Sequence, residues 1–167
     1  MASTQSISEW NGSTPTETPN RTDCDWKAVD DSTTAASAAP ISFTNNENSY
    51  TKYQALKFGG TWASISSVNV KIDNNAPATG LSIKGAVVAS YTTPSRSASG
   101  DGAMSTTGAS ANLVSSSTPF GAGTSNSTAS GTMYTQCVRT QLQTTSSFAG
   151  GPGAIATRTI TWSWTES

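Results

Sequence analysis

The residue types that carry most enzymatic chemistry are scarce in this sequence. None of the 167 residues is a histidine, so the chain lacks the commonest general base and metal ligand and cannot hold a Ser-His-Asp or Cys-His arrangement. Ser49 and Lys52 match a Ser-x-x-Lys motif, but the Ser-Asp-Asn and Lys-Thr-Gly partners of that acylase motif are absent. Because serine and threonine fill 55 positions, this match is expected by chance. We therefore predict no nucleophilic centre.

Carboxylates are the remaining candidates for catalysis or metal binding. A glycosidase needs two of them at one sugar site, and none of the ten acidic residues stands in such a pattern beside an aromatic platform. Asp23 and Asp25 lie near Asp30 and Asp31, a cluster of the oxygen ligands that Ca²⁺ prefers. The spacing lacks the Asp-x-Asp-x-Asp-Gly order of a calcium loop. We expect these acids in turns and at strand ends, and we predict no enzyme, no metal and no cofactor.

The two cysteines and the start of the chain bear on the compartment. Cys24 and Cys137 do not suggest a zinc site in a chain without histidine. The first residues lack the basic and apolar segments of a secretory signal, so we expect synthesis and assembly in a cytoplasm. Free thiols are then expected, with a disulfide between the two cysteines as the alternative.

The overall composition excludes several classes of partner. Only 11% of the residues are charged and the net charge is −1, which leaves no basic patch for nucleic acid. No stretch approaches the roughly 20 apolar residues of a membrane span. A hydrophobic fraction of 34% predicts a thin core, as in a two-layer β structure.

Alternation of apolar and polar residues predicts strands. The clear patterns lie at 62–72, 81–91, 134–142 and 156–164, and weaker ones lie at 6–10, 24–29, 41–44 and 49–58. About eight short strands separated by turn signals predict an all-β fold, a single β-sandwich that is jelly-roll-like or immunoglobulin-like. A short helical turn within 29–39 is the most helix that we expect.

Two segments do not fit a compact sandwich. Residues 1–25, which include Pro15 and Pro19, are predicted to form an extended N-terminal arm, and residues 26–167 the sandwich domain. The long Ser/Gly-rich loop at 92–131 has few apolar residues. It contains either two weak strands, near 103–107 and 111–117, or an arm that becomes ordered on a neighbouring subunit.

Tryptophans divide into two groups. Trp62, Trp162 and Trp164 are in phase with apolar strand faces, so we expect them in the core or at a subunit contact. Trp10 and Trp26 lie outside the strong strand patterns. We expect these two at an interface, either with a partner subunit or with a ligand.

Several motifs together resemble a family of phage proteins. Their elements are Ser8-Glu9-Trp10-Asn11-Gly12, the Tyr-x-Lys-Tyr segment at 48–53, Leu56-Lys57-Phe58, and the strands at 134–142 and 157–166. Together they resemble the small all-β virion accessory proteins of tailed bacteriophages, whether decoration, cement or tail-associated proteins.

The resemblance implies a structural protein of the virion, assembled in the host cytoplasm. The preferred role is a capsid decoration or cement subunit whose partners are the major capsid protein and further copies of itself. Trp10, Trp26, Tyr50 and Tyr53 are the expected interface residues. The alternatives are a tail, collar or fibre component, or a carbohydrate-binding adhesin module in which exposed aromatic side chains bind a glycan.

Overall fold

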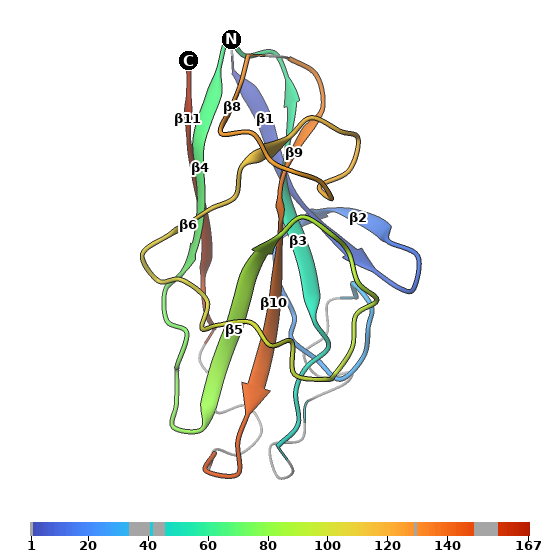
Figure 1. Cartoon of the computed structure of the whole chain (residues 1–167), viewed down its shortest axis with the longest axis vertical. Helices are drawn as coiled ribbons and strands as arrows, with labels where there is room; N and C mark the ends of the chain where they lie inside the picture. Colours follow the sequence, from blue (N-terminus) through green and yellow to red (C-terminus); the bar gives the residue numbers. More distant parts are fainter. Residues whose placement is uncertain (1, 34–40, 42–45, 129, 149–156) are drawn as a thin grey trace.

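The computed structural model describes residues 2–33, 41, 46–128, 130–148 and 157–167, and these contain strands and loops but no helix. The strands form two antiparallel sheets (Figure 1). The larger sheet holds β1 (Ser3–Asn11), β2 (Thr16–Arg21), β3 (Lys52–Gly60), β5 (Leu81–Val88), β7 (Leu113–Val114), β9 (Met133–Thr135) and β10 (Cys137–Thr144). The smaller sheet holds β4 (Ile65–Ile72), β6 (Ala109–Ser110), β8 (Asn126–Ser127) and β11 (Ile160–Glu166).

Strand β3 is the centre of the larger sheet. The strand order is β2-β1-β3-β10-β5, and β9 pairs with the end of β3 that β10 leaves free. Between β9 and β10, at Gln136, the backbone does not pair with β3. The Gln136 N–H donates to the Asn112 carbonyl at 2.7 Å instead of to β3. The Leu56 N–H is then satisfied by the Thr135 hydroxyl at 3.1 Å. A side chain thus replaces a missing ladder bond, as the burial of this amide requires.

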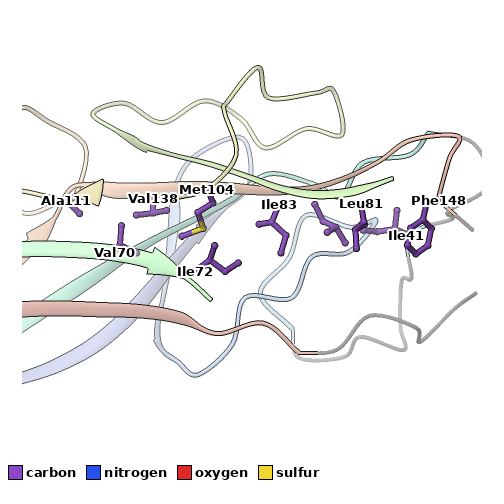
Figure 2. Packing of buried hydrophobic residues seen from close by; sticks show 10 residues of the cluster. Ile41, Val70, Ile72, Leu81, Ile83, Met104, Ala111, Val138 and Phe148 are labelled. Carbon is purple, nitrogen blue, oxygen red and sulfur yellow. The ribbon is translucent and has the colours of Figure 1, made fainter. Parts of the chain in front are cut away.

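Apolar residues from both sheets meet in the core. In β4, Val68, Val70 and Ile72 are buried, whereas Asn69 and Lys71 alternate with them on the other face. Figure 2 shows Val70 opposite Val138 of β10 and Ile72 beside Ile83 of β5, together with the other labelled members of this cluster. A second cluster joins Leu56 and Phe58 of β3 to Ile65 and Val68 of β4. The two sheets are therefore held together by interleaved aliphatic and aromatic side chains.

Most strands expected from alternation are confirmed. The patterns at 6–10, 49–58, 62–72 and 81–91 correspond to β1, β3, β4 and β5, the pattern at 134–142 to β9 and β10, and the pattern at 156–164 to β11. The strand expected at 24–29 is wrong, because this segment is irregular. In the proposed helical turn, residues 29–33 form no helix and the rest lies outside the described residues, as do residues 42–44 of the strand expected at 41–44.

The two segments that did not fit a sandwich both lie against the larger sheet. Residues 3–11 and 16–21 of the expected arm form the hairpin β1–β2, and β1 pairs with β3 along its whole length. The chain ends meet at one end of the molecule (Figure 1), where Glu166 accepts hydrogen bonds from the Ser3 N–H and hydroxyl at 2.7 and 2.6 Å. Within the 92–131 loop, β7 pairs with β9 of the larger sheet, whereas β6 and β8 pair with β4 of the smaller sheet. Residues 97–101 and Phe120 of this loop cover the outer face of the larger sheet.

Hydrogen bonds fasten this loop to the sheet. The Gln141 side chain of β10 donates to the Ser97 carbonyl and accepts from the Ser99 N–H, both at 2.9 Å. Arg139 forms a bidentate pair with Asp101 at 2.8 and 2.6 Å. Polar contacts therefore bury a sheet face that offers few apolar side chains.

Gly80 and Gly100 form a matched pair for testing how tightly the turn after β4 packs. Both have φ of +75°, but a Cβ at Gly80 would meet the backbone of Phe148 and lie 2.7 Å from the carbonyl carbon of Ser147, whereas one at Gly100 meets nothing within 4 Å. We expect Gly100→Ala to cost about 1 kcal/mol, for the left-handed backbone alone, and Gly80→Ala about 3 kcal/mol. Urea denaturation measures both, and equal losses would contradict the packing described.

Candidate functional site

Charged and amide side chains gather on the inner face of the larger sheet, where β1 lies beside β3. The register pairs Glu9 with Gln54 and Trp10 with Tyr53, so Asn11 comes next, opposite Lys52. Because alternate residues of a strand share a face, Glu9 and Asn11 of β1 lie on the same side as Lys52 and Gln54 of β3. The exposed fractions of the Glu9 and Lys52 side chains are both only 1%.

Glu9 is the acceptor that joins these side chains. Its Oε1 lies 3.1 Å from Lys52 Nζ and 3.1 Å from Asn11 Nδ2. Its Oε2 accepts from Gln54 Nε2, also at 3.1 Å. One carboxylate thus receives three donors, which is the arrangement that makes a buried charge tolerable.

The irregular segment 22–33 covers this cluster. The Asp23 carbonyl accepts from Gln54 Nε2 at 2.7 Å, and the Asp31 carbonyl accepts from Lys52 Nζ. Lys27 is buried, and its Nζ donates to the Asp31 carboxylate and to the carbonyl and hydroxyl of Thr33. Beyond the residues predicted as a strand, the carbonyls of Asp31 and Thr33 therefore turn toward two buried lysines.

Burial and pairing change the titration of two groups in this segment. The hydrogen bond from Lys27, followed by those from Thr33, lowers the pKa of Asp31 from 3.8 to about 2. Burial, together with the nearby Glu9 carboxylate, raises the pKa of the Cys24 thiol to about 12. Burial also raises the pKa of Cys137. Both cysteines are free, as expected, and their thiols stay protonated at neutral pH, so neither is a ready nucleophile.

Three of the four acids considered for calcium binding have other partners. Asp23 pairs with Arg21, Asp31 with Lys27, and Asp30 Oδ2 accepts from the Gly12 N–H at 2.9 Å. The described part of the chain contains no group of three or more metal-binding side chains. It also contains no helix that is long and apolar enough to cross a bilayer.

Two of the four expected interface residues are buried within the chain. Trp10 is 3% exposed and packs edge-on against Phe120 and Tyr134, with ring centroids 5.7 and 5.6 Å apart. Tyr53 is 0% exposed and lies against Tyr91, with centroids 4.7 Å apart. Because Tyr91, just before the 92–131 loop, and Phe120 within it cover these rings, a partner subunit finds neither Trp10 nor Tyr53 at the surface. Burial by this chain's own loop therefore replaces the expected contact at these two positions.

The other two expected interface residues are partly exposed. Trp26 packs at the edge of the core, and its Nε1 donates to the Thr140 hydroxyl at 3.0 Å. The Tyr50 N–H donates to the Lys27 carbonyl at 2.9 Å, which ties the approach to β3 onto the covering segment. The interface role of both residues stays a prediction.

The sequence contained only part of the signal for the Glu9 cluster. Glu9 and Asn11 are two residues apart around Trp10, the spacing of neighbours on one strand face. Nothing local marked Lys52 as buried, since its environment depends on segment 22–33. Comparison of the chain with protein-family models, with curated proteins and with solved structures gives no match. The resemblance to phage virion proteins therefore stays a prediction.

Glu9→Gln tests how strongly the buried pair contributes to stability. Loss of the carboxylate leaves the Lys52 ammonium buried without its counter-charge, and we expect the free energy of unfolding to fall by about 3 kcal/mol. The control is Glu47→Gln, which breaks the more exposed pair with Arg96 (31 and 35% exposed) and is expected to cost less than about 1 kcal/mol. Urea denaturation at neutral pH compares them, and similar losses would contradict the buried role.

The lowered pKa of Asp31 predicts a pH dependence. A carboxyl whose pKa is lower in the folded state stabilises the fold above its unfolded pKa, and this contribution disappears as the pH falls through the folded value. We expect the stability difference between the wild type and Asp31→Asn to shrink as the pH falls from about 4 to about 2. A stability difference that stays constant across this range would contradict the prediction. Denaturation curves recorded across this pH range measure the stability difference between the wild type and Asp31→Asn.

Proposed function

We propose that this chain is a structural protein of a tailed-phage virion, most specifically a capsid decoration or cement subunit. In this proposal its two sheets form a β-sandwich, jelly-roll-like or immunoglobulin-like, that binds the outer shell by subunit contacts. The major capsid protein is its main partner, and copies of the chain associate with one another. Assembly takes place in the host cytoplasm and the protein remains in the virion.

The edge strand β11 is the observation that carries the proposal. Among the described residues it pairs only with β4, so its other edge keeps its backbone groups unpaired. The register is regular from Ile160 to Ser163 and shifts between Ser163 and Thr165. Glu166, at the end of the strand, is its only charged residue. Proteins that act as monomers usually protect such an edge with lysine or proline, so the edge of β11 supports strand addition by a partner.

The pairing of most charged side chains with one another within the chain also supports a structural role. The described residues form seven ion pairs, which engage seven of the ten acids and seven of the nine bases of the sequence. The exposed face of β11 presents Thr161, Ser163 and Thr165. A surface of hydroxyl groups forms hydrogen bonds with a partner without the entropy loss that long charged side chains suffer.

The contact surface in this proposal differs from the arm expected from the sequence. Because β1 and β2 are built into this chain's own sheet, β11 takes the place of the arm in reaching a neighbour. Trp26 and Tyr50 remain candidate contacts, and Trp26 lies beside Ile160 and Trp162 of β11. Many copies on one shell would convert modest contacts of this kind into stable attachment.

Lysine substitutions on β11 test the proposed attachment. We expect the variant carrying Thr161→Lys and Ser163→Lys to bind purified shells of the encoding phage about tenfold more weakly, a loss of about 1.4 kcal/mol. The control carries Thr106→Lys and Ser116→Lys on exposed loop positions, adds the same charge, and should bind normally. Co-sedimentation with shells measures both, and equal binding by the two variants would remove β11 from the interface.

Copy number separates the decoration role from the tail, collar or fibre alternative. Quantitative mass spectrometry of purified particles is expected to find hundreds of copies of this polypeptide. A count of about a dozen would favour the tail machinery instead. Absence from particles would overturn both versions.

A polar groove favours the glycan-binding alternative. It has a volume of about 570 Å³, within the range of ligand sites, and its lining includes Asn46, Asn48, Lys84 and Gln143. Its lining contains no aromatic side chain, and a sugar-binding site usually uses one as a stacking platform. Binding of the isolated protein to a glycan array, abolished by Gln143→Ala without loss of folding, would support this alternative over the virion role.

A further inference from the structure

The contacts of Glu9 Oε1 bring together the parts of a covalent reaction. This one oxygen lies 3.1 Å from Lys52 Nζ, an amine, and 3.1 Å from Asn11 Nδ2, the nitrogen of a carboxamide. Asn11 and Lys52 lie one position beyond Trp10 and Tyr53, the last pair of the β1–β3 register, and their side chains share the inner face of the sheet. The Asn11 carbonyl oxygen is buried and has no hydrogen-bond partner.

We propose that Lys52 and Asn11 form an intramolecular isopeptide bond, with Glu9 carrying the proton. Glu9 takes a proton from Nζ, and the Nζ lone pair attacks Asn11 Cγ, so that the C=O electron pair moves to Oδ1. As that pair returns, the Cγ–Nδ2 bond breaks and Nδ2 takes the proton from Glu9, leaving as ammonia. Glu9 then takes the second proton from Nζ, which leaves a neutral amide, and passes this proton to the ammonia. The products are one Lys–Asn amide and one ammonium ion, and the reaction needs no other reactant. Glu9 reaches both nitrogens at distances suited to proton transfer.

The neighbouring groups select Asn11 as the reaction partner. Gln54, the other amide at this site, contacts Glu9 through Oε2, while its Nε2 also donates to the Asp23 carbonyl. The Asp31 carboxylate is paired with Lys27. Among the described residues, only the Asn11 amide shares Glu9 Oε1 with Lys52 Nζ. This one oxygen can therefore accept a proton from the Lys52 amine and pass it to the departing Asn11 nitrogen.

A competing reaction at Asn11 is restrained. An Asn-Gly sequence can lose ammonia by attack of the glycine nitrogen on the asparagine side chain, which gives a succinimide. Here the Gly12 N–H donates to Asp30 Oδ2 at 2.9 Å, which holds this nitrogen away from Asn11 Cγ. No donor in the described residues faces Asn11 Oδ1, so the oxyanion lacks the stabilisation that accelerates acyl transfer. We therefore expect the isopeptide bond to form slowly after folding.

Peptide mapping of the full-length protein tests the proposal. The protein is digested with trypsin when fresh and after days of incubation at mildly alkaline pH, and the peptides are sequenced by mass spectrometry. We expect a peptide of residues 1–21 joined to one of residues 28–57, lighter by one ammonia than the sum, with cleavage after Lys52 blocked. Separate 1–21 and 28–52 peptides in the aged sample would overturn the proposal. A 1–21 peptide that has itself lost ammonia, with normal cleavage at Lys52, identifies the succinimide and also overturns it.

Two amide variants form a matched pair. Asn11→Ala and Gln54→Ala each remove one amide donor from Glu9 and keep the Glu9–Lys52 pair. We expect Asn11→Ala to abolish the joined peptide and Gln54→Ala to retain it, and the opposite result would contradict the assignment. Glu9→Gln should also prevent the reaction. Glu9→Gln is expected to lower the free energy of unfolding whether or not the cross-link forms. The peptide map, and not the stability measurement, therefore decides whether the isopeptide proposal is right. The proposal does not depend on the function proposed above.

Discussion

The structure depends on burying both faces of β3 in a chain that has few apolar residues. Six of the first seven residues of this strand, from Lys52 to Phe58, are buried, and they include a lysine and a glutamine. The inner face packs against the smaller sheet at one end and against segment 22–33 at the other. The outer face is covered by the 92–131 loop. Because the chain cannot cover two faces with hydrocarbon alone, it pairs its polar groups with one another, as burial requires.

This constraint explains which parts of the fold the sequence predicted. The apolar–polar alternation of β4 and β11 arises where one face meets the core and the other meets solvent, so Ile72 or Trp162 could be placed from periodicity alone. The outer covering carries no such signal. Gln141 and Arg139 are ordinary polar strand residues until Ser97, Ser99 and Asp101 contact them, and these contacts are distant in sequence. The burial of Tyr53 and Trp10 likewise depends on Tyr91, Phe120 and Tyr134, which are distant from them in sequence.

The same reasoning applies to the site. A lysine in a strand is normally exposed, and the sequence around Lys52 contains nothing that contradicts this. Its burial depends on Asp31, which reaches it across the fold from a segment that alternation misread as a strand. The proline residues of the N-terminal hairpin likewise indicated an arm, because proline usually ends strands. Pro19 lies in β2, at the edge of the larger sheet, the one place in a sheet where its missing N–H is harmless.

The presence of the Glu9–Lys52 pair needs an explanation beyond stability. Replacing a buried ion pair with well-packed apolar residues is often neutral or stabilising, so selection for stability alone would favour hydrocarbon here. Two gains remain that hydrocarbon cannot provide. One is register, since an ion pair between β1 and β3 disfavours a slipped pairing of these two strands. The other is the proposed isopeptide reaction. Only this second gain accounts for Asn11, whose amide nitrogen contacts Glu9 while its buried carbonyl oxygen has no hydrogen-bond partner. A pair that served register alone would gain nothing from that unsatisfied oxygen, which costs about 1–3 kcal/mol.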